Sequence, residues 1–170
     1  MDTVPGGPEQ AFVALLERHQ RILYRVARAY GRTAADRDDL VQEITAALWR
    51  AFPRFDETRR FSTWMYRIAL NVAISFVRAE HRRVERLIDV DAASLDISVM
   101  EIQANDRVGR LHDFISTLGE IDKALMLLYL EACSYSEISA ALGLTETNVA
   151  TKLARIKQKA KFALDRAETL

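Results

Sequence analysis

The chain has 170 residues, with 24 Lys and Arg against 24 Asp and Glu, 49% hydrophobic residues, 6 Gly and 3 Pro. This composition excludes disordered, collagen-like and turn-rich all-β proteins, and the length allows one ordinary domain or two small ones. The formal net charge of zero argues against a protein that coats nucleic acid through bulk charge attraction.

Three amphipathic helices are predicted in the first half of the chain, because apolar residues recur there at three- and four-residue steps. The first helix ends at Gly31 and the second at Pro53, while Ser62 is predicted to cap the third. Together the three helices would form a small bundle. The apolar positions are Phe12, Leu15, Leu16, Ile22, Leu23, Val26 and Tyr30, then Leu40, Val41, Ile44, Leu48, Trp49 and Phe52, and finally Trp64, Met65, Ile68, Val72, Phe76 and Val77.

Residues 83–105 are predicted to be a linker, because residues 87–103 hold acids between scattered aliphatic residues without sustained periodicity. The mostly charged residues 78–86 leave a solvated continuation of the third helix open as an alternative. A second helical module follows. Ser134 and Glu137 match a capping box, Gly143 ends the short helix that this box starts, and Thr145 can cap the next helix. A short helix, a glycine turn and a longer basic helix form the helix-turn-helix pattern. The predicted fold is therefore all-α, with two small helical domains joined by a linker.

The last predicted helix carries a basic face on an otherwise neutral chain. Its basic residues follow one another with no acid between them: Lys152, Arg155, Lys157, Lys159 and Lys161. In a DNA-binding helix, residues near the start would meet base edges, and the lysines would mostly meet phosphates. The alternative is a solvated terminal helix, whose basic end the helix dipole favours. The residues predicted to face outward are Glu146, Thr147, Ala150, Thr151, Ala154, Arg155 and Gln158.

A second group combines aromatic side chains, one amide and several arginines on the third helix. Such a combination can stack and hold unpaired bases. Trp64 and Phe76 also lie on the apolar stripe, so core packing is the alternative interpretation for them. The group consists of Phe61, Trp64, Tyr66, Asn71 and Phe76, bordered by Arg59, Arg60, Arg67 and Arg78.

Acidic residues surround the start of the second helix, where they complement its dipole. No histidine or phosphate-binding loop accompanies them, so we expect helix capping or protein docking rather than a metal site. This acidic group is Asp36, Asp38, Asp39 and Glu43. The three histidines, His19, His81 and His112, suggest no nucleophile–base pair, and Cys133 is interpreted as a small buried hydrophobe. We therefore expect no enzyme, cofactor or metal.

The sequence also indicates a cellular compartment. A single cysteine cannot form an internal disulfide, and no apolar run reaches the roughly 20 residues of a membrane span. The first residues lack the basic and apolar parts of a signal peptide. We expect a cytoplasmic protein.

Three segments resemble bacterial RNA polymerase sigma factors of the extracytoplasmic function (ECF, group IV) family. They are residues 39–43 (DLVQE), 61–71 (FSTWMYRIALN) and 135–138 (YSEI) with the following helix. The resemblance implies a region-two domain at residues 10–82, a linker at 83–105 and a region-four domain at 106–165. It also implies a transcription initiation factor that binds core RNA polymerase, recognises promoter DNA and is controlled by an anti-sigma factor.

The resemblance implies three sets of site residues. The core polymerase would contact Asp39, Leu40, Gln42 and Glu43. The melted minus-ten element would contact Arg60, Trp64, Arg67, Asn71 and Arg78, with Asn71 matching the position that holds a flipped base. The minus-thirty-five duplex would contact Thr147, Thr151, Lys152, Arg155 and Lys157.

The chain departs from the family pattern in its last helix. Thr147 and Asn148 stand where many relatives have glycine and threonine, and Ala150 stands where a basic residue is frequent, which affects the promoter sequence that is read. Two other functions remain open from the residues alone. One is a dimeric helix-turn-helix regulator that binds duplex DNA without polymerase, and the other is an adaptor that binds protein and never DNA.

Overall fold

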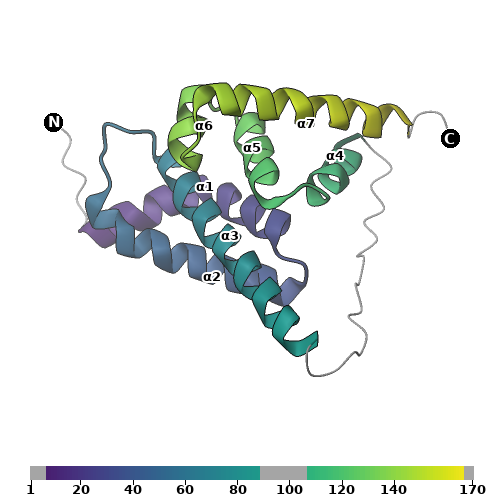
Figure 1. The fold of residues 1–170 in the computed structure, drawn as a ribbon. Coiled ribbons are helices and arrows are strands. Elements are labelled where there is room, and N and C mark those ends of the chain that lie inside the picture. The colour runs from purple at the N-terminus through teal and green to yellow at the C-terminus, as the bar shows by residue number, and fades with distance from the viewer. Residues whose placement is uncertain (1–6, 89–106, 167–170) are drawn as a thin grey trace.

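The computed structural model describes residues 7–88 and 107–166, and every regular element within them is a helix (Figure 1). The all-α prediction is confirmed. None of these helices is long and apolar enough to cross a membrane. The first module comprises α1 (Pro8–Tyr30), α2 (Ala34–Ala51), the 3-10 helix η1 (Phe52–Arg54) and α3 (Phe61–Ile88). The second comprises α4 (Arg107–Ser116), α5 (Glu120–Leu130), α6 (Tyr135–Leu142) and α7 (Glu146–Arg166).

The core of the first module lies where α1, α2 and α3 each pack against the other two. Its side chains are those that the helical period predicts for α1 and α2, and burying each one stabilises the fold by roughly 1.5 to 3 kcal/mol. The fully buried ones include Val26, Leu40, Ile44, Leu48 and Met65. Trp49 departs from the prediction, because its side chain is 42% exposed and touches the ring of Phe12 only by an edge.

The chain turns sharply between α1 and α2, and two local features fix this turn. Gly31 ends α1 at a close approach, where an added Cβ would lie 2.7 Å from Cγ of Arg37 and 2.9 Å from the carbonyl oxygen of Ala27. Thr33 and Asp36 then form a capping box, in which each side chain accepts a hydrogen bond from the other residue's amide, at 3.0 Å and 2.8 Å. The helix α2 therefore begins at Ala34, directly after its cap Thr33.

The prediction for α3 was wrong at its start. The helix begins at Phe61, and the first backbone bond runs from the amide of Trp64 to the carbonyl of Arg60 at 3.2 Å. Ser62 therefore lies inside the first turn and does not cap it. At the other end α3 continues to Ile88, so residues 83–88 of the predicted linker are helical, and the remainder lies outside the described residues.

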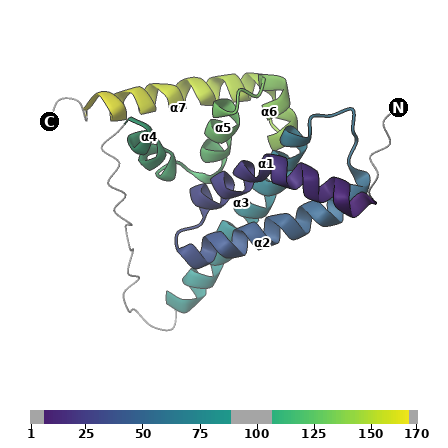
Figure 2. The ribbon, with the colours of Figure 1, turned by 180° about the vertical axis from the view of Figure 1, so that it is seen from behind.

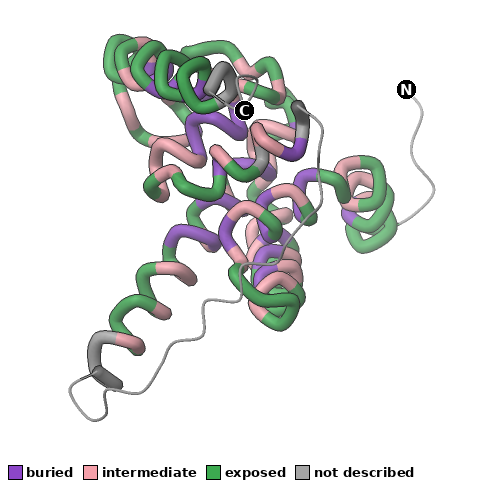
Figure 3. Tube along the Cα trace, turned by 90° about the vertical axis from the view of Figure 1, so that its right-hand side faces the viewer, coloured by how far each residue is buried: buried purple, intermediate pink, exposed green. Residues whose placement is uncertain are grey.

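The buried face of α3 also differs from the predicted stripe. Of the predicted stripe Met65 alone is buried, whereas Trp64, Ile68 and Phe76 are only half-buried, because residues beside that stripe face the centre of the bundle. The buried residues are Phe61, Met65, Tyr66, Ala69, Leu70, Ala73 and Ile74. Past this core α3 projects beyond the other helices, and most of its described residues there are exposed (Figure 3).

The second module has the predicted helix-turn-helix. Ser134 and Glu137 form the capping box of α6, and Gly143 follows the helix in the left-handed region at φ 67°. The hydroxyl of Thr145 accepts a hydrogen bond from the amide of Asn148 at 3.2 Å and thereby caps α7. The predicted inward residues Val149, Leu153 and Ile156 are buried with Leu125, Leu128 and Ile138.

The two modules pack against each other. The second module lies over α1 and α3, with α4 and α5 against α1 and with α5 and α6 against α3 (Figures 1 and 2). Tyr30 donates a hydrogen bond from its hydroxyl to the carbonyl of Glu120 at 2.6 Å. Lys123 donates from Nζ to the carbonyl of Ala29 at 2.8 Å and lies 5.2 Å from the ring centroid of Tyr30.

We expect Gly143→Ala to lower the free energy of unfolding by about 1 kcal/mol, because a side chain in the left-handed region is strained. A Cβ at this position would meet no atom within 4 Å, so the cost is conformational and not steric. Gly143→Asn is the matched control, since asparagine tolerates this conformation and should lose less. Chemical denaturation of the full chain measures both, and equal losses would contradict the conformational explanation.

Candidate functional site

The exposed face of α7 places three predicted DNA contacts in one line. Thr147, Thr151 and Arg155 follow at four-residue steps and are all exposed, so they lie on the same side of the helix. The hydroxyl of Thr151 donates to the carbonyl of Thr147 at 2.9 Å. This face begins directly after the helix-turn-helix turn, where a recognition helix meets base edges.

The predicted DNA-binding cations of α7 contact α5, and these include Arg155, whose Nη2 lies 3.7 Å from Oδ2 of Asp122. Lys152 is half-buried, and its Nζ lies 3.5 Å from Oδ1 of Asp122 on α5. Lys157 lies 4.7 Å from the ring centroid of Tyr129. Both lysines therefore contact α5 and do not project straight from the exposed line. Of the other predicted outward residues, Ala150 is half-buried.

On α3 the structure brings part of the predicted minus-ten group together. Arg67 and Asn71 are exposed and lie one turn apart. Trp64 lies one turn before them and is half-buried, with its ring centroid 4.9 Å from that of Phe55 and 5.3 Å from that of Phe61. The indole is thereby fixed by other rings while part of its surface stays accessible.

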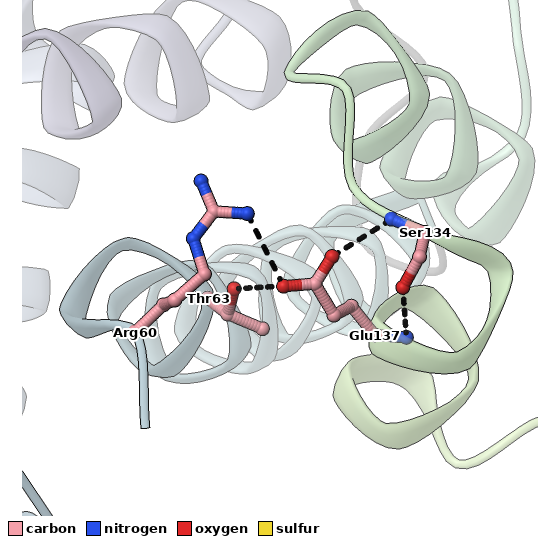
Figure 4. A network of polar contacts seen from close by, with 4 residues as sticks. All are labelled: Arg60, Thr63, Ser134 and Glu137. Atoms are coloured by element: carbon pink, nitrogen blue, oxygen red, sulfur yellow. Dashed lines mark hydrogen bonds and ion pairs between the residues drawn. The ribbon is translucent and has the colours of Figure 1, made fainter. Parts of the chain in front are cut away.

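Arg60, at the start of this surface, binds the second module (Figure 4). Its guanidinium lies 3.4 Å from Oε1 of Glu137, and the hydroxyl of Thr63 donates to the same oxygen at 3.3 Å. The other oxygen of Glu137 accepts the amide of Ser134 at 2.8 Å. One carboxylate therefore caps α6 and holds the start of α3.

Two further arginines of the first module pair with acids at the two ends of α5, Glu120 at its start and Glu131 directly after its last residue. Arg78 lies with Nε 2.9 Å from Oε2 of Glu120. Arg25 pairs with Glu131 and donates to the hydroxyl of Tyr66 at 3.3 Å. Tyr66, which the sequence analysis grouped with the base-binding residues, is 1% exposed and is a core residue.

The acidic face of α2 carries three of the four residues predicted to meet the polymerase. Asp39, Gln42 and Glu43 are exposed. The predicted polymerase contact of Leu40 was wrong, because this side chain is 0% exposed and packs inside the bundle, where no partner can reach it. Asp36 serves the capping box of α2.

The histidines and the cysteine, for which the sequence predicted no catalytic role, lie in the following environments. His19 is half-buried against the ring of Phe61, and burial, followed by Arg18, lowers its pKa, so it is neutral at pH 7. Burial raises the pKa of the half-buried Cys133 thiol, with Glu137 adding to the effect. His81 is exposed, and the side chain of His112 lies outside those described. Among the described residues no cluster of three His, Cys, Asp or Glu has the arrangement of a metal site.

Sequence reasoning missed the acids that hold the predicted DNA-binding cations. Glu120, Asp122 and Glu137 each contact one or two of these cations. Glu137 was found only as a capping residue. No local pattern could have paired Arg60 with Glu137, because 77 positions separate them.

The two modules coincide with two family models. The model described as Sigma-70 region 2 matches residues 15–83, and the model described as Sigma-70, region 4 matches residues 109–159. The RNA polymerase sigma factor CnrH of Cupriavidus metallidurans is 31% identical, over 94% of this chain and 90% of that protein. The ECF RNA polymerase sigma-E factor of Escherichia coli K12 is 27% identical, over 93% and 88%.

Solved structures show the same arrangement of helices. A structure of CnrH in complex with the cytosolic domain of CnrY matches with a TM-score of 0.66 at 28% identity, covering 94% of this chain and 91% of that one. The sigma factor RpoE of Bartonella quintana, in complex with the anti-sigma factor NepR, matches with a TM-score of 0.71 at 18% identity, covering 92% and 96%. The second likeness concerns the fold alone.

The charge of Glu137 should make the stability depend on pH. The pKa of the Glu137 carboxyl lies below its usual value, and the largest cause is the hydrogen bond that it accepts from the Ser134 backbone amide. The Ser134 hydroxyl, Arg60 and Thr63 lower this pKa further, whereas desolvation by burial raises it. A depressed pKa stabilises the fold above the unfolded value of about 4.3, and the effect is lost as the pH falls through the folded pKa.

We therefore expect wild type to exceed Glu137→Gln in free energy of unfolding at pH 6, and the difference to shrink as the pH falls to 3. Urea denaturation at a series of pH values measures this. Glu57→Gln, an exposed carboxylate, is the control. A difference between wild type and Glu137→Gln that stays constant over this range would contradict the linkage.

Proposed function

The chain belongs to the extracytoplasmic function group of the RNA polymerase sigma factors, and we propose that its exposed faces divide the work of promoter-specific initiation. It is an alternative sigma factor, which brings core RNA polymerase to specific promoters. The observation that carries the division of roles is the separation of three exposed faces, on α2, α3 and α7, each with distinct chemistry.

The proposal assigns region two to residues 10–82 and region four to residues 106–165. The family consists of transcription factors that are not enzymes, and we assign this chain no catalysis and a cytoplasmic location. The neighbour RpoE is bound to an anti-sigma factor, and an anti-sigma factor is the proposed inhibitor of this chain as well.

The proposed polymerase contact is the exposed side of α2. Asp39, Gln42 and Glu43 share this side, whereas Leu40 and Ile44 anchor the opposite side in the core. An acidic and amide-bearing face on a rigid helix suits a basic partner surface. Leu40 contributes indirectly, because its burial fixes the helix that presents the other three.

The proposed minus-ten contact is the exposed surface around Asn71. An unpaired base costs a few kcal/mol to extrude, and stacking on an aromatic ring returns about 1 to 3 kcal/mol. Trp64 offers a ring that its neighbours fix, Asn71 offers an amide edge, and Arg67 offers a charge for the backbone. Arg60 and Arg78 extend the same function at the two ends of the surface.

The proposed minus-thirty-five contact is the exposed line on α7. Thr147, at the helix start, is positioned for base edges, with Thr151 and Arg155 one and two turns further on. Lys157 supplies a phosphate contact in the proposal, and Lys152 supplies a second one where a phosphate displaces Asp122. Both currently contact α5, so a phosphate must replace that contact.

The packed arrangement bears on when DNA can bind. Arg60 and Arg78 are held by Glu137 and Glu120, and a phosphate must compete with those carboxylates for the same guanidinium groups. We propose that the modules separate when the chain joins polymerase and promoter. Separation then frees both guanidinium groups from their carboxylates without any new charge on the chain.

The reconstituted reaction tests the assignment of function. We expect the purified chain and core RNA polymerase together, and neither alone, to give a start-site-specific transcript from DNA upstream of the chain's own gene. A chain that shifts this duplex by itself and never enters the polymerase complex would instead support the dimeric regulator.

The double variant Asp39→Arg with Glu43→Arg tests the docking face. We expect it to fold and to lose at least about tenfold in affinity for core polymerase, because like charges then meet at the interface. Glu17→Arg with Glu57→Arg makes the same change in net charge at other exposed positions and should bind normally. Co-purification of the first variant with polymerase at the wild-type level would refute the docking assignment.

Asn71→Ala tests the pocket for an unpaired base. We expect about tenfold slower open-complex formation by holoenzyme, because one or two hydrogen bonds to the base are lost. Ser75→Ala, one turn further on the exposed side, is the control. On a promoter with an abasic nucleotide at the captured position, wild type and variant should open at the same rate, because no base remains for Asn71 to bind. An Asn71→Ala protein that opens intact promoters normally would contradict the role.

A further inference from the structure

Side chains of helix α5 contact all three cations that are assigned to the minus-thirty-five duplex, which are Lys152, Arg155 and Lys157. Helix α5 packs against α7 (Figures 1 and 2). Asp122 lies with Oδ1 3.5 Å from Nζ of Lys152 and with Oδ2 3.7 Å from Nη2 of Arg155. Tyr129 faces Lys157. The positions of the charges on α7 are therefore set from a neighbouring helix.

One carboxylate is shared between two cations that lie three residues apart on α7. Asp122 is in the first turn of α5, where the helix dipole favours an acid. Its side chain is 21% exposed and that of Lys152 is 29% exposed, so solvent screens this contact less than it screens a fully exposed pair. The shared carboxylate leaves the two cations with one net positive charge.

Lys152 and Arg155 differ in how much of each side chain stays accessible to DNA. Arg155 is 57% exposed, and one nitrogen near Asp122 leaves its other donors open to solvent. Lys152 is drawn toward α5, away from the exposed line. Contacts of lysine with phosphate add affinity without sequence information, whereas an oriented arginine can discriminate a guanine by about 1 to 3 kcal/mol.

We propose that Asp122 is a positioning residue that increases the sequence discrimination of α7 by orienting Arg155 toward base edges, and that it lowers the sequence-independent affinity by withholding Lys152 from phosphates. This inference rests on the proposed role of α7 at the minus-thirty-five element. It adds a residue on α5 that touches no DNA and still determines how specifically DNA is read.

The test compares wild-type and Asp122→Asn holoenzyme on two duplexes, one with the native upstream element and one with that element scrambled. We expect the variant to bind the scrambled duplex more tightly and to lose about fivefold in the ratio of the two affinities. The freed Lys152 should release about one more counterion, so the slope of log affinity against log salt becomes steeper by about one.

Two double variants separate the parts of the inference. With Arg155→Ala already present, Asp122→Asn should no longer change discrimination, because no guanidinium remains to be oriented. With Lys152→Ala present, it should no longer steepen the salt dependence. Asp122→Glu retains the carboxylate and should restore discrimination toward the wild-type ratio, which a loss of folding would not explain.

Asp113→Asn on α4 is the matched control, because it removes an exposed acid from the same module. We expect it to leave both the ratio and the slope unchanged. An Asp122→Asn protein with the wild-type ratio, or an Asp113→Asn protein with the same loss, would overturn the inference. A wild-type holoenzyme that fails to distinguish the two duplexes would overturn the proposed role of α7 instead.

Discussion

The arrangement of the two modules depends on the contact between the end of α1 and the start of α5. Lys123 donates to the carbonyl of Ala29 in the last turn of α1, where a cation also complements the helix dipole. Tyr30 is 5% exposed and donates to the carbonyl of Glu120, so the buried hydroxyl is satisfied. This contact fixes α5 against α1, and α5 in turn positions α6 and α7.

Charge complementarity follows from that contact. The acids Glu120, Glu131 and Glu137 face Arg78, Arg25 and Arg60 across the boundary between the modules. In each of these three pairs one arginine is balanced by one carboxylate, which is consistent with the formal net charge of zero. The closed arrangement therefore competes with the proposed binding of DNA to Arg60 and Arg78, because a phosphate and a carboxylate would share the same guanidinium groups.

Local signals were most informative in the second module, whereas the local prediction of Ser62 as the cap of α3 was wrong. The capping box at Ser134, the left-handed turn at Gly143 and the cap at Thr145 were all predicted, since each involves residues within four positions. Long-range facts were not predictable. A helical period fixes only approximately which way a side chain faces, so it missed the burial of Tyr66. Leu40 is different, because the period placed it correctly inward and only the family resemblance put it among the contacts. The partners of Arg60 and Lys123 are fixed by tertiary packing, for which a single sequence carries no signal.

Glu137 shows how local folding and the contact between modules can share one side chain and still be separable. Its Oε2 accepts the Ser134 amide within α6, while its Oε1 accepts from Arg60 and Thr63 on α3. Separation of the modules breaks only the second set. The cap of α6, and with it the turn at Gly143 that aims α7, remains in place, because those bonds lie wholly within the second module. The domain can therefore leave region two as a preformed reader of duplex DNA.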